Sequence, residues 1–392
     1  MSSVTRPTIP AMAHAPGATD AAQRAPEYVR AIAPYVGGKP IDEVARELDL
    51  DPATIIKLAS NENPRGASPK ALAAIARAAG ELTRYPDGNG YALKSALAAR
   101  RAVRPEQIVL GNGSNDVLEL VTQAFLRPGD HAVYSQYAFI VYPLATQARG
   151  AIGIEVPAKD YGHDLDAIRA AITPATRVVF IANPNNPTGT WLAGDVVERF
   201  VSQVPRDVIV VLDEAYDEFL EASEQANSTA WISRYPNLVV SHTFSKAHGL
   251  AALRVGYGVM HAAIADLLNR VRQPFNVNAL AQAAALAALD DEQYVEDSRR
   301  LNREGLRQLA TGLRALGLHF LPSHGNFILV DVGEAQAVYQ ALLRRSVIVR
   351  PVANYDLPTW LRVTVGTAPE NERFLEALAG SLAAAHAGPR AH

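Results

Sequence analysis

The chain has 392 residues, and its 37 basic and 40 acidic side chains give a formal net charge of −3. A balance of this kind supplies no basic surface for nucleic acid, so we expect small-molecule partners. The chain contains no cysteine, which excludes disulfides, thiolate metal sites and cysteine nucleophiles and fits a reducing compartment. We expect the protein to bind no metal ion.

The N-terminal residues 1–26 are rich in Ala, Pro, Ser and Thr and lack the apolar core of a secretory signal, so we expect a disordered leader. The apolar stretch NALAQAAALAAL is too short to span a membrane and carries Asn and Gln. These two features predict a cytoplasmic protein. The length favours one large domain and a smaller one.

Residues 60–288 carry the pattern of a large α/β domain. Short apolar runs predict strands at QIVL, HAVYS, RVVFIA, VIVVL, LVVSH and GYGV, and VLELVTQAFL and AIADLLNRV predict helices. Strands without strict alternation, separated by helices, are typical of a mostly parallel sheet covered on both faces.

The remaining segments predict a small α+β domain. Residues 289–392 read as a long charged helix from Gln293, strands at NFILVDV, VIVR and WLRVTVG, and helices from Ala335 and from Glu370. We expect residues 27–59 to contribute to this domain.

Chemically useful side chains follow four of the predicted strands. Ligands of parallel sheets bind outside the carboxyl ends of the strands, so these groups are expected to meet. The segments are GNGSND after QIVL, NPNNPTG with Asn186, DEAY with Asp213 and Tyr216, and TFSKAHGLAALR with Ser245, Lys246 and Arg254.

Each segment alone has an ordinary explanation as a turn, a helix cap or a surface charge. Together they match one cofactor, pyridoxal 5′-phosphate, whose aldehyde forms a Schiff base with a lysine. Lys246 would bind the aldehyde and move a proton, and Asp213 would keep the ring nitrogen protonated. Arg254, Ser245 and the helix N-terminus at GNGSND would bind the phosphate.

With LASNENPRG, RYPD and LRVTVG added, these motifs resemble the fold-type I aminotransferases, and more narrowly the histidinol-phosphate aminotransferase branch. The resemblance extends over about residues 28–382. It implies a large cofactor-binding domain with a mostly parallel sheet, a smaller α+β domain, and a homodimer.

The resemblance also implies roles for single residues. Lys246, Asp213 and Tyr216 would be catalytic, with Tyr216 and Asn186 on the ring oxygen. The other implied contacts are Ser114 and Asn115 on the phosphate, Tyr137 stacked on the ring, Tyr85 on the phosphate of the neighbouring subunit, Arg362 on the substrate α-carboxylate, and Tyr35, Asn186 and Arg350 around the rest of the substrate. His248 and Ala252 depart from the usual pattern of the cofactor loop.

The implied reaction is a ping-pong transamination. L-Glutamate would leave as 2-oxoglutarate, and imidazole acetol phosphate would become L-histidinol phosphate, as in histidine biosynthesis. Because histidinol phosphate has no α-carboxylate, we expect Arg362 to bind carboxylate in one half-reaction and phosphate in the other. Three alternatives stay open: an aromatic amino acid aminotransferase, a decarboxylase of a phosphorylated amino acid, and an inert cofactor-binding regulator.

Overall fold

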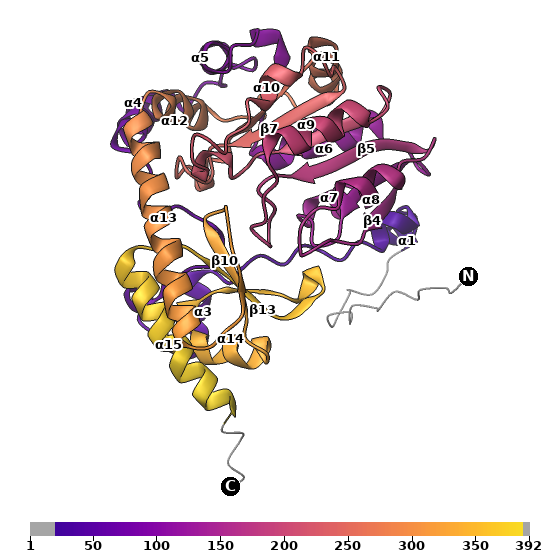
Figure 1. Ribbon diagram of the computed structural model, residues 1–392. Helices are drawn as coiled ribbons and strands as arrows, with labels where there is room; N and C mark the ends of the chain where they lie inside the picture. The colour runs from indigo at the N-terminus through magenta and orange to yellow at the C-terminus, as the bar shows by residue number, and fades with distance from the viewer. Residues whose placement is uncertain (1–19, 387–392) are drawn as a thin grey trace, which may run out of the picture.

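A seven-stranded sheet lies at the centre of the larger domain (Figure 1). The computed structural model describes residues 20–386. All six strands predicted in this domain are present, together with one more, Ile152–Val156 at the edge. In spatial order the strands are β2 (Ile108–Gly111), β8 (Gly256–Met260), β7 (Leu238–Thr243), β6 (Ile209–Asp213), β5 (Thr176–Ala182), β3 (His131–Ser135) and β4 (Ile152–Val156).

Both faces of this sheet are buried, which explains the continuous apolar runs. In β5, Val179 and Ile181 enter one core cluster, whereas Val178 and Phe180 enter the cluster on the other face. Helices α6, α7 and α11 cover the second face, and the remaining helices contribute mainly to the first. The helices are α4 (Pro69–Ala78), α5 (Tyr91–Arg101), α6 (Ser114–Phe125), α7 (Val141–Gln147), α8 (Leu165–Ala170), α9 (Gly194–Gln203), α10 (Ser228–Trp231), α11 (Ala262–Val271) and α12 (Ala279–Leu289).

The direction of β8 decides where the functional groups meet. Strands β3 to β7 pair in parallel, but β8 runs antiparallel to both β7 and β2. Gly256 at the start of β8 therefore lies opposite Thr243 at the end of β7 and Gly111 at the end of β2. The segment that precedes β8 is thus brought to the same edge as the carboxyl ends of the other strands.

The smaller domain has its own core around a four-stranded antiparallel sheet. Buried residues of this core come from residues 44–59 and 309–378, so the early segment joins the C-terminal part of the chain. Strand β1 (Ile56–Lys57) pairs with β11 (Val347–Ile348). The other elements are α3 (Ile41–Leu48), α13 (Glu292–Ala315), β9 (Phe320–Leu321), β10 (Phe327–Asp331), α14 (Ala335–Leu343), β12 (Arg350–Val352), β13 (Leu357–Thr364) and α15 (Ala368–His386).

This architecture confirms the predicted α/β class, with a mostly parallel sheet in a large domain and a small α+β domain. The exact limits at residues 60 and 288 stay a prediction, since the long helix α13 contacts both domains. Its first turns bind the large domain through Arg299, which donates to the carbonyl of Glu218 at 2.9 Å. Its later residues Leu309 and Leu313 lie in the core of the small domain.

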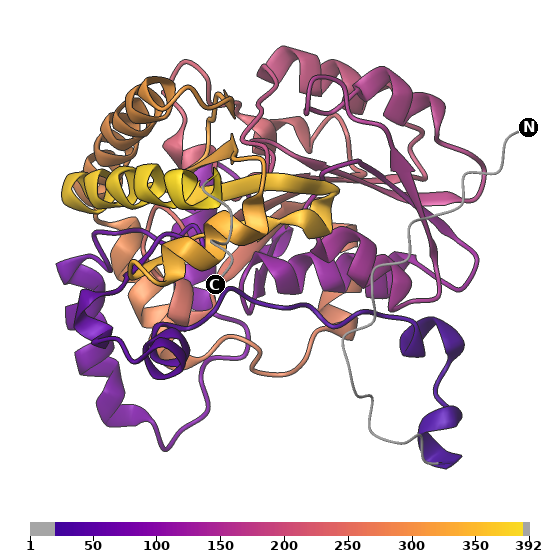
Figure 2. The same ribbon diagram turned by 90° about the horizontal axis from the view of Figure 1, so that it is seen from below.

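The expectation of a disordered leader over residues 1–26 stays a prediction, because the structure describes only residues 20–26 of it. Residues 1–19 lie outside the described residues, but Asp20–Gln23 form the helical turn α1, and α2 (Glu27–Arg30) follows. The alanine content of α1 favours a helix, and Tyr28 anchors the segment: its carbonyl accepts a 3.2 Å hydrogen bond from Gln147. Beyond α2 the chain runs extended from the large domain to the small one (Figures 1 and 2).

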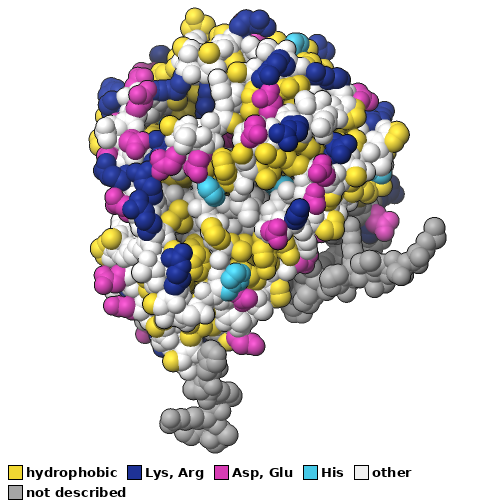
Figure 3. Space-filling view, viewed as in Figure 1, with side chains coloured by type: hydrophobic (Ala, Val, Ile, Leu, Met, Phe, Trp, Pro, Cys, Tyr) yellow, Lys and Arg dark blue, Asp and Glu magenta, His cyan; other side chains and the backbone are white. Residues whose placement is uncertain are grey.

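Acidic and basic side chains are interspersed over the face shown in Figure 3, which agrees with the small net charge. Among the described residues, no helix is long and apolar enough to cross a membrane.

Candidate active site

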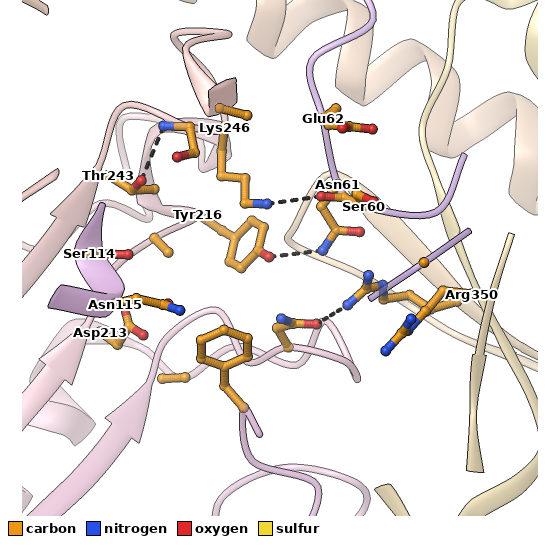
Figure 4. A pocket seen from close by; sticks show the side chains of 18 of the residues that line it. Ser60, Asn61, Glu62, Ser114, Asn115, Asp213, Tyr216, Thr243, Lys246 and Arg350 are labelled. Carbon is orange, nitrogen blue, oxygen red and sulfur yellow. Dashed lines mark hydrogen bonds between the residues drawn. The ribbon is translucent and has the colours of Figure 1, made fainter. Parts of the chain in front are cut away.

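A cavity of about 430 Å³ lies where the strand ends of the large sheet meet the small domain (Figure 4). Tyr85 and Tyr137 are the two predicted site residues that do not line it. The eleven that do are Tyr35, Ser114, Asn115, Asn186, Asp213, Tyr216, Ser245, Lys246, Arg254, Arg350 and Arg362.

Lys246 projects into this cavity from the loop after β7. Its Nζ donates a 3.1 Å hydrogen bond to the carbonyl oxygen of Ser60 (Figure 4). Burial, and then the positive charge of Arg362, lowers the pKa of Lys246 to about 7, although Glu62 acts in the opposite direction. A large fraction of the amine is therefore unprotonated near neutral pH, as a nucleophile or a base requires.

The anion end of the cavity is formed where α6 begins. Gly113 precedes the helix with φ 86° and ψ 167°, a conformation available almost only to glycine. A Cβ there would lie 2.5 Å from Nη2 of Arg254, so the absent side chain leaves room for the guanidinium beside the helix N-terminus. Ser114, Asn115 and Ser245 line the same end of the cavity. Backbone N–H groups, hydroxyls and one guanidinium are the donors that a phosphate group needs.

Asp213 ends β6 and is almost fully buried. Its Oδ2 accepts a 2.9 Å hydrogen bond from the hydroxyl of Tyr142. Its Oδ1 is buried and accepts no hydrogen bond from any described residue. Burial raises the pKa of Asp213 to about 6. An unpaired carboxylate oxygen in a ligand cavity calls for a cationic or N–H partner.

Tyr216 is held by a residue that the sequence analysis left without a role. Asn61 donates from Nδ2 to the hydroxyl of Tyr216 at 2.9 Å (Figure 4). The hydroxyl oxygen thus accepts from Asn61 and keeps its own proton to donate into the cavity. Burial raises the pKa of Tyr216 to about 12, so the side chain is a neutral donor at physiological pH.

Two arginines lie side by side on the small-domain wall of the cavity. Arg350 on β12 pairs directly opposite Arg362 on β13. Arg362 donates to Oδ1 of Asn186 at 2.6 Å and to the carbonyl of Ala59 at 2.8 Å, while its Nε is buried without a partner among the described residues. Arg350 donates to the carbonyl of Val36 at 2.7 Å, with its guanidinium carbon 5.6 Å from the ring centre of Tyr35.

The assignment of Tyr137 to the cavity is wrong. Tyr137 adopts φ 57° in the turn after β3, and its ring stacks on Tyr161 at 5.7 Å in a cluster with Trp360, away from the cavity. Phe139 and Tyr142 line the cavity instead.

Tyr85 lies on the surface, with an exposed fraction of 83% and a ring stacked on Phe275 at 4.8 Å. Its predicted contact with a neighbouring subunit stays a prediction.

The two departures from the family pattern are accommodated locally. His248 is buried against Phe244 at 4.8 Å between ring centres, and its Nε2 lies 3.5 Å from a carboxylate oxygen of Glu218. Ala252 lines the cavity wall. Neither residue displaces a predicted reacting group.

A second group of titratable residues lies behind the strand ends. Glu214, Asp217 and His242 come close enough to suggest a metal site. However, a guanidinium nitrogen of Arg101 lies 3.3 Å from Nδ1 of His242, and Arg101 supplies the positive charge that a metal would otherwise bring. This group is therefore explained as a buried ionic network.

Comparison with known proteins agrees with this geometry. The family description "Aminotransferase class I and II" matches residues 53–378, most of the chain. The chain therefore belongs to the class I and II aminotransferases, and the predicted family is confirmed.

Individual relatives carry a narrower name. The chain is 63% identical to "Histidinol-phosphate aminotransferase 2" of Pseudomonas fluorescens (strain Pf0-1) over 91% of this chain and 96% of that protein. It is 58% identical to histidinol-phosphate aminotransferase of Methylobacillus flagellatus, over 90% and 96%. Its structure resembles that of histidinol-phosphate aminotransferase from Sinorhizobium meliloti in complex with pyridoxal-5′-phosphate, with a TM-score of 0.86, 27% identity, and coverage of 94% and 99%.

Proposed function

We propose that this protein transfers an amino group from L-glutamate to imidazole acetol phosphate, giving 2-oxoglutarate and L-histidinol phosphate, with pyridoxal 5′-phosphate as cofactor. The observation that carries the substrate assignment is the pair of arginines on β12 and β13. A phosphorylated substrate needs a second anion site besides that of the cofactor, and Arg350 and Arg362 supply it at the small-domain wall. The names of the similar proteins point the same way.

The described residues fit the cofactor. The donors beside Gly113 suit its phosphate, and the unpaired Oδ1 of Asp213 suits its ring nitrogen. Tyr216 and Asn186 offer hydrogen-bond donors to its ring oxygen, while Phe139 supplies an aromatic face. The cavity volume also falls in the range of sites that hold a cofactor and a small substrate.

When bound, this cofactor supplies an electron sink for the carbanion that forms when an amino acid loses its α-proton. The protein supplies the base: Lys246 Nζ, with its lowered pKa, takes the proton and returns it at a different carbon. The carboxylate of Asp213 would stabilise the positive charge on the ring nitrogen, and the hydroxyl of Tyr216 would donate a hydrogen bond to the ring oxygen.

Arg362 and Arg350 bind the anionic groups of the two substrates. In the glutamate half-reaction, Arg362 binds the α-carboxylate; in the other, the two guanidiniums bind the substrate phosphate. To bind a carboxylate through two parallel bonds, Arg362 can offer its unpaired Nε together with Nη2, the terminal nitrogen that also donates to the carbonyl of Ala59.

The proposed assembly is a cytoplasmic homodimer in which Tyr85 reaches the phosphate site of the partner. Large apolar side chains are exposed in residues 72–91 and at Phe275, which stacks on Tyr85, and a subunit contact would explain their exposure. They are Leu72, Leu82, Tyr91 and Phe275. Sedimentation of the purified protein tests the dimer, and weaker cofactor binding by Tyr85→Phe tests the shared site.

The substrate assignment is tested by single-turnover absorbance of the bound cofactor with L-histidinol phosphate, L-phenylalanine or L-glutamate. Conversion by histidinol phosphate and glutamate supports the proposal. Conversion by phenylalanine and glutamate, with histidinol phosphate inactive, identifies an aromatic amino acid aminotransferase. Carbon dioxide release identifies a decarboxylase, and a bound cofactor that no substrate converts identifies a regulator.

A matched pair of variants tests the second anion site. Arg350→Ala should weaken the use of histidinol phosphate by about 10-fold to 100-fold, because one charged contact to phosphate is lost. The same variant should change little the turnover of an amino acid whose side chain is uncharged, such as L-phenylalanine. Arg344→Ala removes an equal charge from an exposed position outside the cavity, and it should leave both reactions unchanged. Equal effects of the two variants on histidinol phosphate would argue against a phosphate contact.

A further inference from the structure

Tyr142 is a buried residue of α7. The one polar atom of its side chain, the hydroxyl oxygen, contacts the carboxylate of Asp213. Its side chain has an exposed fraction of 0%, and its hydroxyl lies 2.9 Å from Oδ2. A carboxylate oxygen only accepts, so the hydroxyl must be the donor. Burial, and then the charge of Asp213, raises the pKa of Tyr142 well above its usual value, so the donor keeps its proton.

The ring of Tyr142 is fixed by its neighbours. It stacks on Phe180 of β5, with centres 4.6 Å apart and an angle of 7° between the planes. Phe139 meets its edge at 5.9 Å and 86°. Contacts on the face and on the edge leave the hydroxyl little freedom, so its direction is set by packing.

This contact makes the two oxygens of Asp213 unequal. Oδ2 is committed to Tyr142, whereas Oδ1 is buried without a partner among the described residues. A carboxyl group rotates readily about its last bond, and a fixed donor on one oxygen removes that freedom. The direction of Oδ1 is therefore fixed before any ligand binds.

From this geometry we infer that Tyr142 is a positioning residue: it fixes the Asp213 carboxylate so that Oδ1 alone faces the ring nitrogen of the cofactor, and it stabilises the ionised form. The inference rests on the proposed function, because it takes Asp213 as the partner of that nitrogen. It adds a residue that acts through Asp213 and does not touch the cofactor nitrogen itself.

Other charged groups also face Asp213, and the test must separate their effects. Asp217 follows on the same turn, Lys246 faces it from the loop after β7, and Tyr216 lies nearby. The hydroxyl of Tyr142 lowers the pKa of Asp213, against the effect of burial. Loss of that hydroxyl should therefore move the protonation of Asp213 to higher pH, with the other groups unchanged.

The test measures the dissociation constant of pyridoxamine 5′-phosphate from the full-length, cofactor-depleted protein between pH 5 and 9. This probe has no aldehyde, so its binding involves no covalent bond to Lys246. Four proteins are compared: the unmodified chain, Tyr142→Phe, Asp213→Asn, and Tyr235→Phe. Tyr235 is a matched control because its hydroxyl also donates to a carboxylate, that of Glu198 at 3.4 Å, outside the cavity.

Tyr142→Phe should weaken binding about tenfold at pH 7.5, since one hydrogen bond to a charged group is lost. It should also raise the pH below which binding declines. Asp213→Asn should weaken binding at least as much and remove that part of the pH dependence. Tyr235→Phe should behave like the unmodified chain.

If Tyr142→Phe keeps the original affinity and pH dependence while Asp213→Asn loses both, the inference is refuted and the proposed function stands. If Asp213→Asn binds normally, the assignment of Asp213 itself fails. Should Tyr142→Phe not fold, Tyr142→His takes its place: the imidazole is too short to reach Oδ2, so the same two changes are expected. Unchanged values in that variant would refute the inference equally.

Discussion

Gly113→Ala should weaken cofactor binding by a route that can be separated from its effect on stability. The new Cβ would lie 2.5 Å from Nη2 of Arg254, well inside van der Waals contact, so the guanidinium must move. If the Arg254 guanidinium loses its contact with the cofactor phosphate, the binding free energy weakens by about 1.5–3 kcal/mol, which raises the dissociation constant roughly 10-fold to 100-fold. In the Gly113→Ala variant, the alanine must adopt the backbone conformation of the glycine, which adds about 1–3 kcal/mol of strain to the folded state.

Gly129→Ala supplies the matched control. Gly129 has φ 87°, almost the same as Gly113 at 86°, but an added Cβ there meets nothing within 4 Å. Both variants should therefore lower the free energy of unfolding by a similar amount, measured without cofactor in urea. Only Gly113→Ala should weaken binding, measured by titrating pyridoxal 5′-phosphate into the depleted protein and recording absorbance. Normal affinity in Gly113→Ala would show that the space beside Arg254 is not the phosphate site.

Three further predictions concern the catalytic groups. The cofactor-depleted protein should capture pyridoxal 5′-phosphate faster as the pH rises, with a midpoint of about 7. This midpoint is the lowered pKa of Lys246, because only the neutral amine attacks the aldehyde. A midpoint near 10 would contradict this prediction. Arg362→Ala should slow both half-reactions, each by roughly 100-fold or more in single turnover, since a buried charged contact is lost; a normal rate in either one would refute its double role. Asn61→Ala should lower kcat by up to about 10-fold through the loss of one hydrogen bond to Tyr216, and an unchanged kcat would mean that the bond does not matter for turnover.

The sequence predicted the large sheet well because its strands are buried on both faces. Such strands consist of apolar runs with little else, as in β5 and β6. The missed strand, β4, lies at the edge and is largely exposed. It also contains Gly153, over which the ring of Tyr134 packs, so that a Cβ would lie 2.1 Å from the tyrosine hydroxyl oxygen. A glycine and a half-exposed pattern are weak strand signals.

The cofactor end of the site was predicted for a topological reason. Groups that follow parallel strands must meet at one edge of the sheet, whatever the intervening helices contain. That argument brings Asn186, Asp213 and Lys246 together without any knowledge of side-chain packing. Arg254 precedes its strand, and it reaches the same edge because β8 runs in the opposite direction.

The same argument gives no information about side-chain direction within a turn. Tyr137, Phe139 and Tyr142 follow the end of β3 within seven residues, and all three are aromatic. The positive φ at Tyr137 directs its ring to a cluster with Tyr161, and the cavity is left to the other two. The left-handed conformation of Tyr137 accompanies the placement of its ring outside the cavity lining, and residue type alone does not predict which rings line the cavity.

Asn61 was missed because its contacts join parts of the chain that no local pattern relates. Its backbone N–H donates to Oγ1 of Thr364 at 2.9 Å, its carbonyl accepts from Asn326 at 3.0 Å, and its side chain donates to Tyr216. It also adopts φ 55°, which asparagine tolerates better than most residues. Two of these partners belong to the small domain and one to the large domain. A residue with a small amide side chain and a left-handed backbone thus links the domain that carries Arg362 to the hydroxyl of Tyr216 in the cavity. We therefore expect Asn61→Ala to disturb the relative placement of the two domains as well as Tyr216.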